Sequence, residues 1–204
     1  MTHLLLIRHG ENEYTRTGKL AGWTKGIHLN EAGQKQAQAL AERLGRAPIT
    51  AIYSSPLERA RETAAPLAKA KGLTVEIRAE LGEVRYGQWT GKSLKRLART
   101  KLWRVVQQQP SAMEFPEGET LRAVQARAVE AIEQIARNHA RDKGPVVAVS
   151  HGDVIKLAVA YYLGMPIDLF QRLMISTASI TALRLGRGHP ALVKFNETGP
   201  LDLR

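Results

Sequence analysis

Residues 4–10 read Leu4-Leu5-Leu6-Ile7-Arg8-His9-Gly10, an apolar run that ends abruptly in Arg-His-Gly. A short apolar run bounded by glycine is typical of a strand that is buried on both faces. In an open α/β sheet, ligands bind just beyond the carboxyl ends of such strands. Arginine binds phosphate as a planar fork, and histidine acts as a nucleophile or proton carrier near neutral pH. The stretch therefore predicts a central strand with a site for chemistry at its end.

Strands and helices alternate along the rest of the chain. The predicted strands cover residues 51–54, 73–78, 145–150, 180–185 and 191–195, the last two around a turn at 186–190. Helices are predicted over residues 31–44, 56–71, 92–106, 119–141 and 153–163, and the first and fourth of them carry apolar residues at helical spacing. This order indicates an α/β protein, and we expect a three-layer α/β/α sandwich around a mostly parallel, mixed sheet.

Two of these helices carry recognisable start signals. Asn30 is a suitable N-cap for the helix over 31–44, because its side chain accepts hydrogen bonds from free backbone N–H groups. The stretch Ser55-Pro56-Leu57-Glu58 matches a capping box with proline at the first helical position, and Gly72 ends that helix. Arg59 is therefore expected in the first turn, close to the end of the strand at 51–54.

The composition narrows the class of protein. The 204 residues suit a single domain, and the absence of cysteine excludes disulfides, thiolate metal sites and cysteine nucleophiles. No apolar stretch approaches the roughly 20 residues that span a bilayer, and we see no signal peptide, so we expect a cytoplasmic protein without membrane association. The formal net charge of +11 favours an anionic partner, such as a phosphorylated metabolite, a nucleic acid or a membrane surface.

Two predicted strands end in a His-Gly pair, at His9-Gly10 and at His151-Gly152. If both strands belong to one parallel sheet, the two imidazoles emerge at the same edge. Arg59 lies near that edge too, at a helix start that adds free N–H groups and a positive dipole. Together with Arg8, these groups predict a site for a tetrahedral dianion.

The motifs along the chain resemble those of the histidine phosphatase superfamily, the group that contains phosphoglycerate mutases and many small phosphatases. They occur in the family's order and cover most of the chain. They are Arg8-His9-Gly10-Glu11, Gly22-Trp23-Thr24, Leu29-Asn30-Glu31-Ala32-Gly33, Ser54-Ser55-Pro56-Leu57-Glu58-Arg59-Ala60, Glu83-Val84-Arg85-Tyr86-Gly87, Phe115-Pro116-Glu117-Gly118-Glu119 and Ser150-His151-Gly152. The resemblance implies a phosphoglycerate mutase-like fold in one domain over residues 1–204.

The resemblance also implies roles in a phosphatase reaction that needs no metal. His9 is implied as the nucleophile that becomes phosphohistidine, and Arg8, Arg59 and His151 as the groups that hold the phosphoryl oxygens. Glu83 is implied as the proton donor to the leaving oxygen and then as the base for water. Phosphoryl transfer depends mainly on positioning and charge neutralisation, which these groups can supply. Further substrate contacts are expected from Asn12, Thr15, Gly22, Arg85, Tyr86 and Gly152.

Each of these roles requires a protonation state. A neutral His9 can attack in line if an acceptor holds its other ring nitrogen, whereas His151 serves best when it is protonated, a form that nearby phosphate favours. Glu83 has to carry its proton at the start, so we expect its anionic neighbourhood to raise its pKa.

The chain departs from the mutase pattern where mutases hold their substrate. A Gly-Leu-Asn-Lys run supplies a substrate-holding lysine in the mutases, whereas Gly91-Lys92-Ser93-Leu94 has Leu94 at that position. Thr15 likewise stands where the mutases have asparagine. We therefore favour a phosphatase of small phosphorylated metabolites, with no cofactor. A phosphoglycerate mutase that uses 2,3-bisphosphoglycerate is the alternative, since Lys92 or Lys95 can substitute for the lysine, and an inactive phosphate-binding protein is a third hypothesis.

A basic segment follows the glutamate motif, and in the family this region tends to cover the active site. Its positive residues are Lys92, Lys95, Arg96, Arg99, Lys101 and Arg104, with no acid among them. The first four share one face of the helix predicted over 92–106. Residues 85–118 are thus expected to form a basic lid that attracts substrates with more than one anionic group. The alternatives are a solvated helix face or a nucleic-acid surface, but aromatic residues are sparse there and we expect no nucleic-acid partner. The sequence leaves open whether the protein forms a homodimer.

Overall fold

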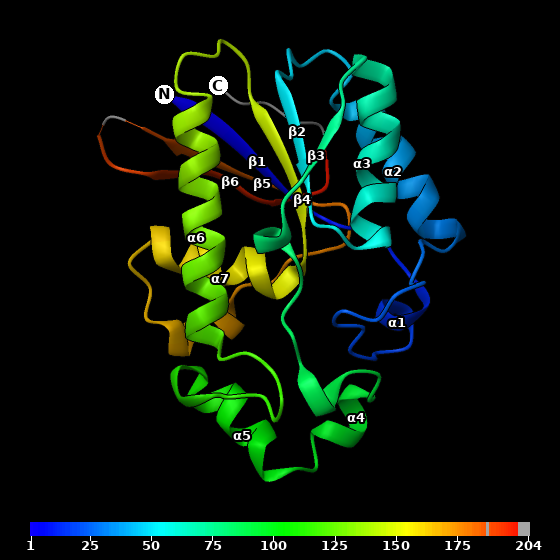
Figure 1. The fold of residues 1–204 in the computed structure, drawn as a ribbon, viewed down its shortest axis with the longest axis vertical. Coiled ribbons are helices and arrows are strands. Elements are labelled where there is room, and N and C mark those ends of the chain that lie inside the picture. Colours follow the sequence, from blue (N-terminus) through cyan, green and yellow to red (C-terminus); the bar gives the residue numbers. More distant parts are fainter. Residues whose placement is uncertain (187, 200–204) are drawn as a thin grey trace.

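The computed structural model describes residues 1–186 and 188–199, which fold into a sheet between helices (Figure 1). Arg187, within the turn predicted at 186–190, lies outside the described residues. Within the two described ranges, six strands form one sheet in the order β3-β2-β4-β1-β5-β6. The strands are β1 (Thr2–Arg8), β2 (Ala51–Ser54), β3 (Val75–Ile77), β4 (Val146–Ser150), β5 (Ile180–Leu185) and β6 (Ala191–Glu197).

The sheet is mixed and mostly parallel, which confirms the fold class that the sequence predicts. Strands β1 to β4 run parallel to one another, whereas β5 pairs antiparallel with both β1 and β6. In the register of β1 and β4, Arg8 lies opposite Ser150. His9 and His151 therefore leave two neighbouring strands at the same edge of the sheet.

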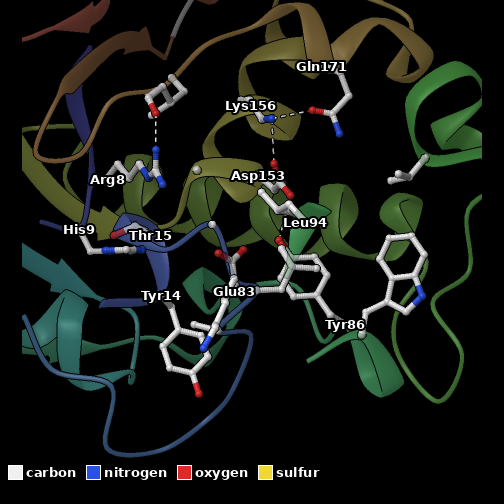
Figure 2. A pocket seen from close by; sticks show the side chains of 18 of the residues that line it. Arg8, His9, Tyr14, Thr15, Glu83, Tyr86, Leu94, Asp153, Lys156 and Gln171 are labelled. Atoms are coloured by element: carbon white, nitrogen blue, oxygen red, sulfur yellow. Dashed lines mark hydrogen bonds and ion pairs between the residues drawn. The ribbon is translucent and has the colours of Figure 1, made fainter. Parts of the chain in front are cut away.

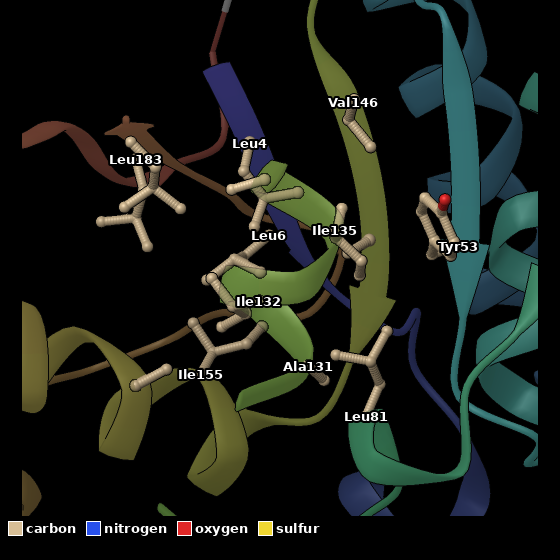
Figure 3. Close-up of a cluster of buried hydrophobic side chains, with 14 of the residues drawn as sticks. Leu4, Leu6, Tyr53, Leu81, Ala131, Ile132, Ile135, Val146, Ile155 and Leu183 are labelled. Carbon is tan, nitrogen blue, oxygen red and sulfur yellow. The ribbon is translucent and has the colours of Figure 1, made fainter. Parts of the chain in front are cut away.

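Helices cover both faces of the sheet, with α2 and α3 on one face and α6 and α7 on the other (Figure 1). β1 contributes to both cores: Leu5 and Ile7 belong to the cluster with α2 and α3, whereas Leu4 and Leu6 pack toward α6 and α7 (Figure 3). The apolar run is therefore buried on both faces, as predicted. No helix within the described ranges is both long and apolar enough to span a bilayer. The helices are α1 (Glu13–Arg16), α2 (Glu31–Arg43), α3 (Glu58–Lys71), α4 (Leu94–Leu97), α5 (Lys101–Gln108), α6 (Leu121–Asn138) and α7 (Gly152–Tyr162), and the 3-10 helices are η1 (Ala79–Leu81), η2 (Gly87–Trp89), η3 (Pro110–Ala112) and η4 (Ile167–Arg172).

The prediction of a single helix over residues 92–106 is wrong. The segment forms two short helices, α4 and α5, which lie at the end of the molecule away from the sheet (Figure 1). Each has its own N-cap, because the side chain of Ser93 accepts from the N–H of Arg96 and that of Thr100 accepts from the N–H of Trp103. Serine and threonine compete for backbone hydrogen bonds in this way, and the second cap interrupts the helix. The basic residues of this segment therefore do not share one continuous helical face.

The capping box predicted at Ser55 also does not form. The N-cap of α3 is Leu57, which makes no side-chain cap, and α3 begins at Glu58. The hydroxyl of Ser55 instead lies 2.8 Å from Nε2 of His151, and the carboxylate of Glu58 accepts from the N–H of Gly26. The hydroxyl of Ser55 also accepts from the N–H of Leu57 at 3.3 Å, before α3 begins, and Arg59 still occupies the first turn of the helix.

Candidate active site

His9 follows directly after β1 and lines a cavity at this edge of the sheet. Its Nδ1 lies 2.7 Å from the carbonyl oxygen of Gly10. Because a carbonyl oxygen only accepts hydrogen bonds, Nδ1 carries the proton and Nε2 keeps a free lone pair. Burial lowers the pKa of His9 well below its ordinary value, and the positive charges of Arg59 and Arg8 lower it further. The ring is thus a neutral imidazole, which can act as a nucleophile through Nε2.

Two guanidinium groups accompany His9 at the cavity. Arg59 is fully buried and donates through Nη2 to the carbonyl of Gly22 at 2.8 Å, whereas Arg8 donates through Nη1 to the carbonyl of Ile175. In the described part of the chain, Nε and Nη1 of Arg59, Nε of Arg8 and Nδ2 of Asn12 are buried donors without an acceptor. Buried donors normally have partners, so this concentration of free N–H groups suits an anion.

His151 follows β4 and is fully buried, and it is not among the residues that line the cavity. Its ring centre is 5.1 Å from that of His9, and its Nδ1 is 3.4 Å from Nη2 of Arg59. Burial is the main cause that lowers the pKa of His151 well below its ordinary value, and the positive charge of Arg59 lowers it further. In this environment the ring is neutral, so the protonated form expected from the sequence depends on a bound phosphate.

Glu83 lines the cavity from the loop between η1 and η2, and Oε2 of its carboxyl group is 3.7 Å from Nδ1 of His151. Burial raises the pKa of Glu83 to about 7, with the charge of Asp153 as the second cause and Arg59 opposing both. The direction agrees with the sequence prediction, but burial outweighs the anionic neighbourhood. A carboxyl group that titrates near pH 7 can both donate and accept a proton at that pH.

The cavity has a volume of about 330 Å³, and the side chains of Figure 2 surround it. One wall is polar: the hydroxyl of Tyr86 donates to Asp153 at 2.9 Å, and Nζ of Lys156 lies 2.8 Å from the same carboxylate. Lys156 also donates to the amide oxygen of Gln171 at 2.9 Å. A carboxylate and an ammonium group therefore stand side by side near the predicted general acid.

Much of the remaining lining is apolar and comes from the segment 85–118. Trp89 and Trp103 stack with their ring centres 6.2 Å apart, and Phe115 packs edge-on against Trp89. These aromatic rings belong to a hydrophobic cluster separate from the two on the faces of the sheet. The apolar residues that this segment contributes to the lining are Trp89, Leu94, Trp103, Val106 and Phe115. Leu20, outside the segment, lines the cavity as well.

The basic residues of 92–104 do not face the cavity. None of the six lines it, and Lys92 and Lys95 are therefore not placed to substitute for a mutase lysine. Leu94 does line it, so an apolar side chain occupies the position at which the mutases have their substrate-holding lysine. The arrangement favours a solvated basic surface over a basic lining.

The structure places four of the six expected substrate contacts, Asn12, Thr15, Tyr86 and Gly152, in the lining of the cavity. The other two, Gly22 and Arg85, are not among the lining residues. Gly22 instead holds Arg59 through its carbonyl oxygen, and the guanidinium of Arg85 stacks 3.8 Å from the ring centre of Trp23.

Sequence reasoning missed several groups at the site. Asp153 is the acid immediately after the second His-Gly pair, and Lys156 is three residues further along α7, so both could have been found from helical spacing. Gln171 lies in η4 and carried no such signal. Ser55 was read as a helix cap, although it bonds His151.

Three potential metal ligands lie together among the described residues. Ligand-type atoms of His9, Glu83 and His151 lie within 4.8 Å of one another. The guanidinium groups of Arg8 and Arg59 share this space, and their charge opposes a cation as strongly as it attracts an anion. The charge balance of the site therefore fits a phosphoryl group better than a metal ion.

Comparisons with known proteins agree with this geometry. Residues 4–198 match the model of a family described as histidine phosphatase superfamily (branch 1). The chain is 30% identical over 200 residues to phosphoserine phosphatase 1 of Hydrogenobacter thermophilus, covering 97% of this chain and 93% of that protein. It is 35% identical over 162 residues to a metal-independent phosphoserine phosphatase of Arabidopsis thaliana, covering 76% and 66%. A mutant phosphoserine phosphatase of Entamoeba histolytica, solved in complex with phosphoserine, superposes with a TM-score of 0.87 at 29% identity, covering 98% of this chain and 100% of that one.

Proposed function

The chain belongs to the histidine phosphatase superfamily (branch 1) and is a phosphatase of small phosphorylated metabolites, and we propose that it acts through a phosphohistidine on His9. The observation that carries this proposal is the free Nε2 of a neutral His9 in a site where Nε of Arg8 and both Nε and Nη1 of Arg59 are buried without an acceptor. A lone pair and unpaired positive donors at one point suit attack on a phosphoryl group.

In the first step, the Nε2 lone pair of His9 attacks phosphorus while the bond between phosphorus and the alcohol oxygen breaks. Glu83 gives its proton to that oxygen, so the alcohol leaves neutral. Arg8 and Arg59 neutralise the charge that spreads over the phosphoryl oxygens. The carbonyl of Gly10 accepts from Nδ1–H and stabilises the positive charge that the ring gains on phosphorylation.

In the second step, water attacks phosphorus and the bond to Nε2 breaks. Glu83, now a carboxylate, takes a proton from that water. Inorganic phosphate leaves, and His9 and Glu83 return to their starting states. No metal takes part in either step, a feature of the proposal supported by the metal-independent relative and by the cationic character of the site. A cytoplasmic location stays a prediction.

The test is hydrolysis of an aryl phosphate in the presence of EDTA by the wild type, His9→Ala and the control His28→Ala, an exposed histidine outside the cavity. We expect activity in EDTA for the wild type and the control, and a loss of at least about 10³-fold for His9→Ala. Labelled substrate leaves an acid-labile, alkali-stable phosphoryl group on the wild type and on the control, but not on His9→Ala. Hydrolysis that persists in His9→Ala rejects the nucleophile.

A mutase reaction is disfavoured because the apolar Leu94 lines the cavity, whereas Lys92 and Lys95 are not among its lining residues. Incubation with 3-phosphoglycerate, primed with 2,3-bisphosphoglycerate, compares isomerisation with release of phosphate. We expect release of phosphate to dominate, and isomerisation far in excess of hydrolysis overturns the proposal.

For the substrate, we propose a phosphorylated amino acid, with phosphoserine first. Two relatives carry that activity in their names, and the Asp153–Lys156 pair offers a carboxylate and an ammonium of the signs that an amino acid requires. Phosphoserine and 3-phosphoglycerate differ only in an amino group replaced by a hydroxyl, and their leaving oxygens are alike. We expect Asp153→Asn to lower kcat/KM for phosphoserine relative to 3-phosphoglycerate, and an unchanged ratio rejects this substrate assignment alone.

A further inference from the structure

Arg127 lies on α6, outside the lining of the cavity, yet it holds the loop that carries Glu83. Its Nη1 donates to the carbonyl oxygens of Glu80 and Gly82, at 2.6 and 2.8 Å, and its Nη2 donates to that of Glu83 at 3.0 Å. These three carbonyls follow one another closely along the chain and end at Glu83 itself. One guanidinium group thus fixes the backbone on the N-terminal side of the carboxyl group.

Glu119 completes the arrangement on the other side of the loop. Its carboxylate accepts from Nε and Nη2 of Arg127 at 2.9 and 3.0 Å, and also from the backbone N–H of Arg85 at 2.8 Å. Nε, Nη1 and Nη2 of Arg127 together make five hydrogen bonds, which is the full number of N–H groups on an arginine side chain. Both side chains are only 19% exposed, so the pair is well shielded from solvent.

The chain just before Glu83 is anchored in the core, because Leu81 is buried and its carbonyl oxygen accepts from the hydroxyl of Ser150 at 2.7 Å. Glu83 itself belongs to neither a helix nor a strand, and besides Arg127 its carbonyl oxygen accepts from the indole N–H of Trp23. Loops are more mobile than the elements that they connect, whereas a general acid has to come within hydrogen-bond distance of the leaving oxygen. A misplacement of about 1 Å can cost on the order of 10²-fold in rate.

We propose that the Arg127–Glu119 pair is a positioning device for Glu83, which sets the efficiency of proton donation without touching the substrate. The inference rests on the proposed function, because it requires Glu83 to be the general acid. It predicts a selective defect: steps that need the proton are slowed, and steps that do not need it are spared.

The leaving group separates these cases. An ester of a strongly acidic phenol, such as 2,4-dinitrophenyl phosphate, expels its oxygen without a proton, whereas an alkyl phosphate needs one. We measure kcat/KM, which reports formation of the phosphoenzyme, for both esters in Arg127→Lys, Glu119→Gln, Glu83→Gln and Arg122→Lys. Arg122 is an exposed arginine of the same helix and serves as the control.

We expect Arg127→Lys and Glu119→Gln to lose about 10²-fold on the alkyl ester and less than about 5-fold on the dinitrophenyl ester, with Arg122→Lys unchanged. Equal losses on both esters indicate general destabilisation and overturn the inference, as does no loss on either. If Arg127→Lys does not fold, Glu119→Gln gives the same readout. The Glu83→Gln arm separates the two proposals: if it spares the alkyl ester, Glu83 is not the acid and that part of the proposed function fails too.

Discussion

The edge of the sheet and the segment 85–118 contribute two parts of one cavity, but they are built in opposite ways. At the sheet edge, strand register and a helix start fix polar side chains that are almost fully buried, such as His9 and Arg59. In the segment 85–118, short helices with separate caps present apolar and aromatic side chains such as Trp103, while their positive charges lie away from the cavity.

The difference corresponds to two kinds of recognition. A phosphoryl group is the same in every phosphomonoester, so the part that binds it can be rigid and polar. The alcohol differs between substrates, and an apolar wall built from short elements can change without disturbing the sheet. We therefore expect substitutions at the sheet edge to affect all substrates equally, and substitutions in the segment 85–118 to affect some substrates more than others.

The strongest test of this contrast is Arg59→Ala. We expect kcat/KM to fall by about 10²–10³-fold for small and bulky phosphomonoesters alike, because the variant loses the charge that we propose to stabilise the phosphoryl oxygens common to both. Steady-state kinetics on one ester of each kind measure the effect. Arg61→Ala, an exposed arginine of the same helix, is the control and should retain activity. A loss of kcat/KM on only one of the two esters contradicts this contrast between the sheet edge and the segment 85–118.

The second test concerns stability and pH. Glu83 holds its proton up to a pKa of about 7 in the folded protein, whereas an unfolded glutamate titrates near pH 4.3. The folded state binds this proton more tightly, so the wild type loses stability as the pH rises through this window. We expect Glu83→Gln to be more stable than the wild type by on the order of 3 kcal/mol at pH 8, with a gain that shrinks toward pH 5.

Urea denaturation at pH 5 and pH 8 measures this difference. Glu80→Gln, at an exposed carboxylate of the same loop, is the control and should change stability little at either pH. A pH-independent effect of Glu83→Gln shows that burial does not hold the proton on Glu83 as described.

The third test addresses the apolar wall. Trp103→Ala removes an aromatic ring from the lining, and we expect kcat/KM to fall about 10-fold for an ester with a large apolar alcohol and about 2-fold or less for a small one. Leu102→Ala, which alters an exposed neighbour in the same helix, serves as the control. Equal losses of kcat/KM on both esters show that Trp103 supports the apolar wall without distinguishing between substrates.

The smallest effect is expected from the basic surface. Lys95→Glu and Arg96→Glu reverse charges that are exposed and outside the lining, so solvent and salt screen them from the substrate. We expect kcat/KM to change by less than about 2-fold at physiological ionic strength. A large loss that salt abolishes indicates that these residues attract the substrate from a distance.

The accuracy of the sequence predictions followed the range of the interactions involved. The helix over 31–44 has a local cap at Asn30 and a local apolar stripe, and α2 runs from Glu31 to Arg43 with that cap in place. The capping box at Ser55 failed because α3 begins only at Glu58, so the Ser55 hydroxyl accepts from the N–H of Leu57 and lies against His151, which is distant in sequence. The helix over 92–106 failed because the prediction gave no weight to the cap at Thr100.

The same distinction applies to the site. The family motifs named His9, Arg59, His151 and Glu83, and the structure brings these side chains together at one edge of the sheet. The motifs did not show that Gly22 supports Arg59 through a carbonyl oxygen. A backbone carbonyl has no identity in the sequence, so its role as an acceptor depends entirely on where the chain folds.

The sequence by itself determined the class of fold and the chemistry at phosphorus. Apolar strands that alternate with helical segments indicate a buried sheet covered by helices. If the two strands that end in His-Gly are parallel neighbours, their imidazoles lie at the same edge of that sheet. Only the tertiary structure decided the protonation states, the composition of the apolar wall and the support of Glu83 by Arg127. These depend on burial and on contacts between segments far apart in the chain, such as residues 80–85, 119 and 127, which no local pattern of residues specifies.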